Sequence, residues 1–437
     1  MHMKKYELDA TYDNLINTLK SDAIGRNSEL VSLLMILDDI EGSVSISLDA
    51  NWGNGKTFFV KQLELILNNH RDKVFNNTID TKLDQIIINN SHLKEIELSN
   101  TYIPIYYDSW LYDDHKDPLL SLIFSIIEDG LIKSNSVEIS NKKEKALSVA
   151  SSIVSLTGCN IDLVKLAEKP NTYLDLIYSV EEIKKLLKSI FDEIITEHSQ
   201  KLIIIIDELD RCRPDYAVNL LEKIKHFFDD DRVIFLFSTN KEQITHTIKK
   251  FYGYHFDATS YLNRFFDFQF ILSDIDSGRY LNYIDVYRNS SEYLQMIAQE
   301  IGQFYGFSIR EYNTYYQKIK KIHEFIKGKS ISGLVFSFQV FSPVIWALSL
   351  KNTEMERKFK SGELSSELEK VLMQTETIKR YALRFISHKG TDDEKIQLVL
   401  NLYSFMFREK SLREFSTDSF DMYDEQRIIF FNKINMM

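Results

Sequence analysis

The chain is 437 residues long, which exceeds one ordinary domain and leaves ample material for a sizeable core. Its composition, 44% hydrophobic and 27% charged, is typical of a folded globular protein and excludes a disordered or collagen-like chain. Glycine (14 residues) and proline (5 residues) are scarce, which favours long helices over a turn-dense all-β fold. Acidic residues outnumber basic ones by 64 to 53, and the resulting net charge of −11 argues against a protein built to coat DNA.

Cysteine usage and hydropathy predict a cytoplasmic protein without a membrane span. Cys159 and Cys212 are too few for a disulfide framework or a four-ligand zinc site, and they suit a reducing compartment. The amino-terminal residues lack an apolar core, so no signal peptide is expected. The uncharged stretch 146–161 is too short and polar to span a bilayer, and is expected to be a buried or interfacial helix. The uncharged stretch 330–350 contains several serines and Pro343, and is expected to form core helices.

Apolar periodicity predicts that helices and strands alternate over the first part of the chain. Helical spacing is expected across 1–42, and 68–100 is polar, asparagine-rich and expected on the surface. Strands are predicted at 44–48, 102–107, 202–206, 233–237 and 266–272, and helices at 58–67, 118–132, 181–197 and 214–228. From about residue 280 onward the spacing is helical.

This order of elements predicts an α/β fold, a parallel sheet with helices on both faces, followed by a mostly helical C-terminal domain. The sheet domain is expected over 1–275, with a polar and helical insertion at about 134–200. The helical domain is expected over 276–437, where it would serve as a lid or an interaction domain.

The segment ANWGNGKT, residues 50–57, lies between a predicted strand and a predicted helix. This is the context of a P-loop, in which backbone N–H groups and the start of a helix bind phosphate. Lys56 would reach the β- and γ-phosphates, and the Thr57 hydroxyl would coordinate Mg²⁺. Ala50 replaces the usual first glycine, which weakens the turn without destroying the site. A chance turn is the alternative. The expected nucleotide-binding residues are Asn51, Trp52, Gly53, Asn54, Gly55, Lys56, Thr57 and Phe58.

Two carboxylates end the apolar run 202–206, on the ligand side of such a sheet. Asp207 would hold Mg²⁺ through water, and Glu208 would polarise the attacking water as general base. The alternative is an acidic surface turn after a core strand. Asn240 follows the next strand and is placed to bond the γ-phosphate or the attacking water, although an ordinary turn asparagine explains it almost as well. Together, the loop and the carboxylates predict a hydrolase of nucleoside triphosphates.

With these residues in view, the chain resembles the KAP family of P-loop NTPases. The segment NWGNGKTFF is similar to the family's G-x-W-G-x-G-K-T loop, with Trp52 in the aromatic position. YYDSWLYDD is similar to the family's F-N-x-W-x-Y block, and YLNRFFDFQF is similar to its Y-L-x-K block. IIIIDELDRCRPDYAVNLLEKIKHFFD is close to the I-D-D-L-D-R-C-x-P block followed by L-E-x-I-K, which generic P-loops do not carry. The resemblance covers about 20–275 and implies an additional-strand ATPase with a catalytic glutamate, which supports Glu208.

The resemblance also directs attention to four arginines. Arg26, in the segment DAIGR, looks like part of the family's segment that precedes the first strand, where contact with the base is implied. Arg211, Arg264 and Arg310 are candidates for an arginine that stabilises transition-state charge near the γ-phosphate. A structural ion pair is the alternative for each of these three.

The leading functional hypothesis is Mg²⁺-dependent ATP hydrolysis that drives a conformational or assembly switch in bacterial antiphage defence. The family includes a phage-exclusion protein, and the C-terminal part shows no nuclease, protease or TIR-like motif, so a homo-oligomer or a separate effector protein is expected as partner. ATP is preferred because TNKE, residues 239–242, only partly matches the guanine-reading N-K-x-D motif. One alternative is a nucleotide-gated scaffold with little hydrolysis, mildly favoured by Ala50. The other is a DNA-sensing or DNA-translocating ATPase, against which the acidic balance counts.

Overall fold

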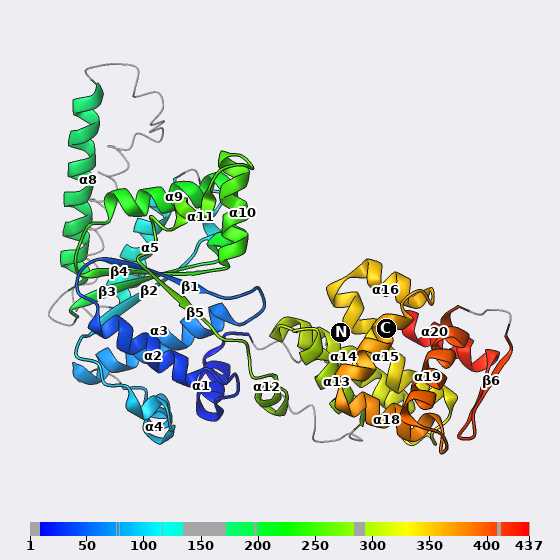
Figure 1. Ribbon diagram of the computed structural model, residues 1–437. Coiled ribbons are helices and arrows are strands. Elements are labelled where there is room, and N and C mark those ends of the chain that lie inside the picture. The colour runs from blue at the N-terminus through cyan, green and yellow to red at the C-terminus, as the bar shows by residue number, and fades with distance from the viewer. Residues whose placement is uncertain are drawn as a thin grey trace. The chain divides into compact units, whose positions relative to one another are not determined.

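The computed structural model describes residues 9–75, 77, 79–115, 117–133, 172–195, 199–283, 293–408 and 412–436. The described residues divide into two compact units (Figure 1). The sheet unit comprises Asp9–Asp22 and Arg26–Asp274, and the helical unit comprises Ala23–Gly25 and the chain from Ile275 onward. The helix expected at 146–161 lies outside the described residues.

A five-stranded parallel sheet in the order β2-β3-β4-β1-β5 organises the sheet unit. Its strands are β1 (Val44–Asp49), β2 (Tyr102–Asp108), β3 (Lys201–Asp207), β4 (Val233–Thr239) and β5 (Phe268–Ile271). Its helices are α1 (Tyr12–Ser21), α2 (Asn27–Asp39), α3 (Lys56–Val74), α4 (Thr81–Asn89), α5 (Pro118–Lys133), α8 (Thr172–Ile194), α9 (Pro214–Phe227), α10 (Lys241–Tyr252) and α11 (Ala258–Leu262). Three short 3-10 turns complete the described elements: η1 (Leu93–Glu95), η2 (Trp110–Tyr112) and η3 (Leu209–Arg211).

The apolar run of β3 forms a central strand because both of its faces are covered by helices. Ile203 and Ile205 are fully buried in the core under α1, α2 and α3. Ile204 and Ile206 point the other way, into the core under α5, α8 and α9. A parallel strand in this position has no polar face, which is why its sequence does not alternate. Figure 1 shows the two layers of helices on either side of the sheet.

Over the described part of 1–42 the helical expectation is met by two helices, α1 and α2, because Asp22 takes a left-handed conformation (φ 47°) that ends the first. Another segment differs from the sequence-based expectation. The polar stretch at 68–100 contains the end of α3 and all of α4, and it buries Leu83, Ile86 and Leu93. The apolar residues of α4 are spaced so that they lie on one face of a helix. The segment was expected on the surface because its composition is dominated by the surrounding asparagines, which conceal this short pattern.

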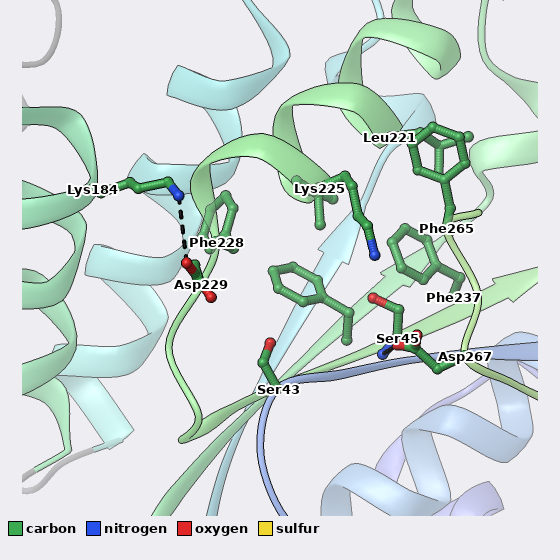
Figure 2. Close-up of a pocket in the computed structure, with 12 residues that line it drawn as sticks. Ser43, Ser45, Lys184, Leu221, Lys225, Phe228, Asp229, Phe237, Phe265 and Asp267 are labelled. Atoms are coloured by element: carbon green, nitrogen blue, oxygen red, sulfur yellow. Dashed lines mark hydrogen bonds and ion pairs between the residues drawn. The ribbon is translucent and has the colours of Figure 1, made fainter. Parts of the chain in front are cut away.

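A cavity of about 280 Å³ opens at the amino ends of β1 and β4, beneath α9 (Figure 2). Its wall combines aromatic residues, such as Phe228, Phe237 and Phe265, with polar residues, such as Lys225 and Asp267. The Asp229 carboxylate on its rim pairs with Lys184 at 3.4 Å. The cavity therefore lies at the sheet edge opposite to the one where ligands of parallel α/β proteins bind.

The helical unit is described by nine helices and one hairpin. The helices are α12 (Ser277–Tyr283), α13 (Tyr293–Phe304), α14 (Ile309–Ile326), α15 (Gly333–Lys351), α16 (Thr353–Lys360), α17 (Ser365–Gln374), α18 (Glu376–Ile386), α19 (Asp392–Phe407) and α20 (Asp424–Asn435). The antiparallel hairpin of β6 (Glu414–Ser416) and β7 (Asp421–Tyr423) is a small addition within the mostly helical domain that the sequence predicts.

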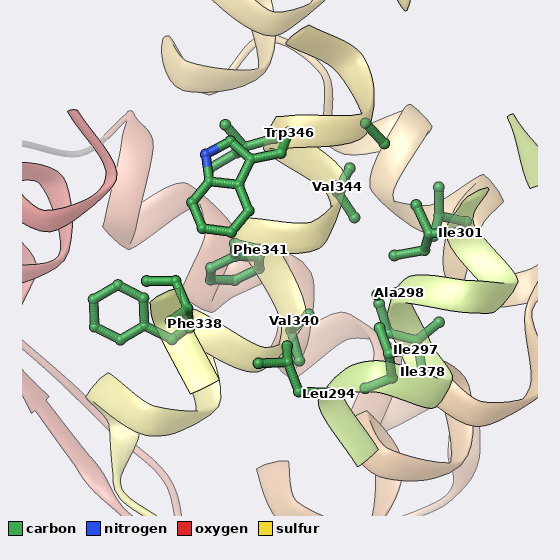
Figure 3. Packing of buried hydrophobic residues seen from close by; sticks show 14 of the residues in the cluster. Leu294, Ile297, Ala298, Ile301, Phe338, Val340, Phe341, Val344, Trp346 and Ile378 are labelled. Carbon is green, nitrogen blue, oxygen red and sulfur yellow. The ribbon is translucent and has the colours of Figure 1, made fainter. Parts of the chain in front are cut away.

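Helix α15 lies at the centre of the helical unit. Among the residues that the structure describes, it is the one helix long and apolar enough to cross a membrane, and 78% of its most apolar window is buried. Phe338, Val344 and Trp346 of α15 belong to the same core as Leu294 and Ile297 of α13 (Figure 3). Burial of this kind explains its apolar composition without a bilayer, because a core helix must be apolar on all sides.

Candidate functional site

The phosphate-loop segment connects the carboxyl end of β1 to the amino end of α3. Gly53 (φ 80°) and Gly55 (φ 75°) take left-handed conformations, which a residue with a Cβ adopts only at a cost. Ala50 is not among the residues with positive φ, so alanine is tolerated at this point of the backbone. The Lys56 ammonium donates to the carbonyl oxygens of Ala50 at 2.6 Å and Asn51 at 3.5 Å, so the lysine folds back over its own loop.

The acidic pair lies at the carboxyl end of β3. Asp207 is 1% exposed, and its Oδ2 accepts a hydrogen bond from the Tyr106 hydroxyl at 2.9 Å. Its Oδ1 accepts the backbone N–H of Glu208 at 3.0 Å. The Lys61 ammonium lies 3.2 Å from the centre of the Tyr106 ring, which it attracts as a cation–π contact. Neighbouring groups therefore fix both oxygens of Asp207.

Glu208 has an unusual backbone and two side-chain partners. Its φ of 60° and ψ of 20° lie in the left-handed region, which is rare for a residue other than glycine. Its carboxylate pairs with Arg211 at 2.5 Å and accepts from the Thr57 hydroxyl at 3.5 Å. Burial and the Asp207 charge raise the pKa of Glu208 to about 7, and the Arg211 charge opposes that rise.

The contact between Thr57 and Glu208 joins the phosphate loop to the acidic pair across 151 residues of sequence. The sheet order explains the meeting, because β4 lies between β1 and β3 and the carboxyl ends of all three reach the same edge. Burial lowers the pKa of Lys56, and the carboxylates of Asp210 and Asp207 oppose this effect. A buried ammonium thus faces a group of carboxylates at this edge.

Asn240 follows β4 and is buried between these two segments. Its side-chain oxygen caps α10 by accepting the backbone N–H of Gln243 at 3.0 Å. A cap of this kind satisfies one of the free N–H groups at a helix start. The residue therefore has a structural task, and its contact with a phosphate stays a prediction.

The four arginines singled out by the sequence occupy different environments. Arg26 is 4% exposed and donates to the carbonyl oxygens of Asn54 and Ser273, each at 2.5 Å. Its guanidinium therefore holds the backbone of the phosphate loop at Asn54. Arg211 pairs with Glu208 and lies 5.5 Å from the Trp110 ring centre. Arg264 is exposed between α11 and β5, and Arg310 is exposed in the first turn of α14 in the helical unit.

Three residues that the sequence did not single out contribute to the site. Tyr106 donates to Asp207, and Lys61 lies over the Tyr106 ring. Asp210 is 6% exposed and accepts the indole N–H of Trp52. Tyr106 and Asp210 lie in sequence blocks that suggested the family, and this was their signal, whereas Lys61 had none. Phe58 is buried in α3, whereas Asn51 is exposed on the loop.

No group of three or more His, Cys, Asp or Glu side chains that could hold a metal ion occurs among the described residues. The arrangement at the edge of the sheet instead offers the buried carboxylate of Asp207 and the hydroxyl of Thr57. Such a donor set suits Mg²⁺, which keeps several waters and takes further oxygens from substrate phosphates.

The chain was compared with known protein families, proteins and solved structures. A family model described as the KAP family P-loop domain matches residues 9–286. An uncharacterized protein of Methanocaldococcus jannaschii is 30% identical in an alignment that covers 30% of this chain and 86% of that protein. The solved structure of the Aeropyrum pernix ORC2 protein, in ADPNP and ADP complexes, aligns with a TM-score of 0.35 and 11% identity, over 87% of this chain and 93% of that chain.

Proposed function

Because the chain belongs to the KAP family of P-loop NTPases, we propose that its sheet unit binds ATP with Mg²⁺ and hydrolyses the bond to the γ-phosphate. The observation that carries this proposal is the hydrogen bond between Thr57 and Glu208, at 3.5 Å. It brings together a phosphate-binding turn and a buried acidic pair, which is the arrangement that phosphoryl transfer to water requires.

The loop residues fit a triphosphate. The left-handed conformations of Gly53 and Gly55 are typical of a backbone nest, in which N–H groups would bond phosphate oxygens, and the start of α3 adds partial positive charge beside it. The Lys56 ammonium, bonded to loop carbonyls, lies within the same turn and would exchange those weak acceptors for phosphate oxygens. The loop therefore supplies both dipoles and a full charge.

Asp207 and Glu208 would have different roles in the reaction. Asp207 and the Thr57 hydroxyl would hold Mg²⁺, which when bound neutralises charge on the phosphate oxygens. Glu208 would accept a proton from the attacking water, for which it must first exchange its ion pair with Arg211. The oxygen of Asn240 caps α10, so its NH₂ group is the donor that would bond the γ-phosphate. Arg211, Arg264 and Arg310 remain candidates for stabilising transition-state charge.

Turnover of ATP by purified protein tests the proposal. Lys56→Ala should raise the Kd for ATP more than tenfold, since a charge-assisted bond to phosphate is lost. Glu208→Gln should retain binding and lower kcat by roughly a hundredfold or more, since it removes the general base. Lys73→Ala is the matched control, because this lysine lies on the same helix and pairs with Asp84. Equal turnover in all four proteins would refute the proposal.

A nucleotide-gated scaffold is a second candidate, favoured by the ion pair that holds Glu208 against Arg211. In this reading ATP binding orders an assembly, and hydrolysis is slow. Assembly measured by light scattering would then survive Glu208→Gln and be lost in Lys56→Ala. Loss of assembly in both Glu208→Gln and Lys56→Ala would favour the hydrolytic switch.

We further propose that this switch serves bacterial antiphage defence in the cytoplasm, in a homo-oligomer or with a separate effector protein. The support is the family to which the chain belongs. Plaque counts on a host that carries the natural operon would test this proposal. Lys56→Ala should raise them to the level of a host without the operon, and unchanged counts would contradict a role in defence.

A further inference from the structure

Trp52 is a large aromatic residue at the tip of the phosphate loop, and 44% of its surface is exposed. Burial in a core does not explain a tryptophan in such a place. Its indole N–H donates to the carboxylate of Asp210, a residue 158 positions further along the chain. The hydrogen bond gives the tryptophan a specific task, because an indole offers one donor and no acceptor.

Asp210 is suited to be the fixed partner of this bond. It lies in η3, directly after β3, and is 6% exposed. A buried carboxylate is costly unless it is hydrogen-bonded or paired with a charge. Burial raises the pKa of Asp210, while the Trp52 hydrogen bond and the Lys56 charge oppose the rise. The carboxylate therefore gains from holding the indole in place.

Two of the contacts that reach the loop from elsewhere in the chain fall on either side of Gly53, one of its two left-handed glycines. Gly53 (φ 80°) lies between Trp52, held by Asp210, and Asn54, whose carbonyl is held by Arg26. Glycine loses more conformational freedom on ordering than any other residue. Fixing both of its neighbours reduces the disorder that a ligand must remove, and such preorganisation increases affinity.

We propose that Asp210 is a positioning residue for nucleotide binding, which holds the phosphate loop in its binding shape through the indole N–H of Trp52. This inference rests on the proposed function, because it concerns the same nucleotide. It predicts that loss of the hydrogen bond weakens nucleotide binding about tenfold, as expected for a bond to a charged group.

Calorimetry with a non-hydrolysable ATP analogue and Mg²⁺ provides the test. Trp52→Phe should raise the Kd about tenfold, and Trp110→Phe, which changes another exposed tryptophan, should not. Asp210→Asn keeps an acceptor for the indole and should bind more tightly than Asp210→Leu, which has none. In a Trp52→Phe background this difference between Asn and Leu should vanish, because the residue would act through a partner that is absent.

Each result is decisive. A wild-type Kd in Trp52→Phe, or an Asn–Leu difference that persists in the Trp52→Phe background, would overturn the inference while leaving nucleotide binding in place. Absence of binding by the wild-type chain would refute the proposed function instead. Should Asp210→Leu fail to fold, as judged by circular dichroism, the comparison of Trp52→Phe with Trp110→Phe still decides the matter.

Discussion

Replacing Arg26 with alanine should destabilise the sheet unit by about 3 kcal/mol. The guanidinium is 4% exposed and donates to the carbonyls of Asn54 and Ser273, each at 2.5 Å. Hydrogen bonds from a charged donor contribute roughly 1.5–3 kcal/mol each, so two of them give about 3–6 kcal/mol. Water entering the space left by the side chain would satisfy part of this demand, which favours the lower end of the range.

Urea unfolding can isolate the effect in the sheet unit. A Trp346→Phe background removes the tryptophan of the helical unit and leaves Trp52 and Trp110 as fluorescent reporters. Arg26→Ala should lower the unfolding midpoint of this signal at an unchanged slope, and Arg26→Lys should lie between it and wild type, since one ammonium cannot bridge both carbonyls as a fork. A decrease of less than about 1 kcal/mol in the free energy of unfolding would refute the reasoning, because one ordinary hydrogen bond contributes that much.

Nucleotide affinity separates support of the loop from general stability. Arg71→Ala is the matched control, because Arg71 is also buried and pairs with Asp72 on α3. Both variants should lose stability. Arg26→Ala alone should bind the ATP analogue more weakly, because it alone frees the carbonyl of a loop residue. Equal affinities in the two variants would show that Arg26 has no particular link to the loop.

Three further substitutions have separable outcomes. Gly55→Ala should raise the Kd for the ATP analogue about fivefold or more in calorimetry, because φ 75° costs an alanine about 1 kcal/mol or more; wild-type affinity would contradict this. Tyr106→Phe removes the donor to Asp207 and should raise several-fold the Mg²⁺ concentration at half-maximal turnover, so an unchanged Mg²⁺ titration would argue against the contact. Trp346→Ala should cost the helical unit about 3–5 kcal/mol, seen as faster hydrogen exchange there, and leave nucleotide affinity as in wild type.

The sequence allowed the strands and the two motifs to be predicted because their signals are local. An unbroken run such as 202–206 has few alternatives to a strand covered on both faces, and the observed strand Lys201–Asp207 extends it by one residue at each end. The phosphate loop was predicted from spacing alone. The parallel sheet, with helices on both faces and a mostly helical C-terminal region, is confirmed.

Contacts between segments far apart in sequence could not be predicted in the same way. The hydrogen bond from the Tyr106 hydroxyl to Asp207 forms because β2 lies beside β3. The residues next to Tyr106 in the sequence give no sign of this pairing. Arg26 was expected near the base from its resemblance alone, and only the fold shows that it binds Asn54 and Ser273. The hairpin of β6 and β7 escaped notice because its strands are three residues long, too short for an alternating pattern.

Under the proposed function, the left-handed backbone of Glu208 lowers the stability of the fold at the same position that supplies the general base. Glycine or asparagine would adopt this conformation more readily than glutamate, so either would make the empty protein more robust. Selection for thermal stability alone would thus be expected to replace the glutamate and yield a chain that binds ATP without hydrolysing it. A hydrolase would retain glutamate in this strained conformation because catalysis needs the carboxylate, although the strain lowers the stability of the fold.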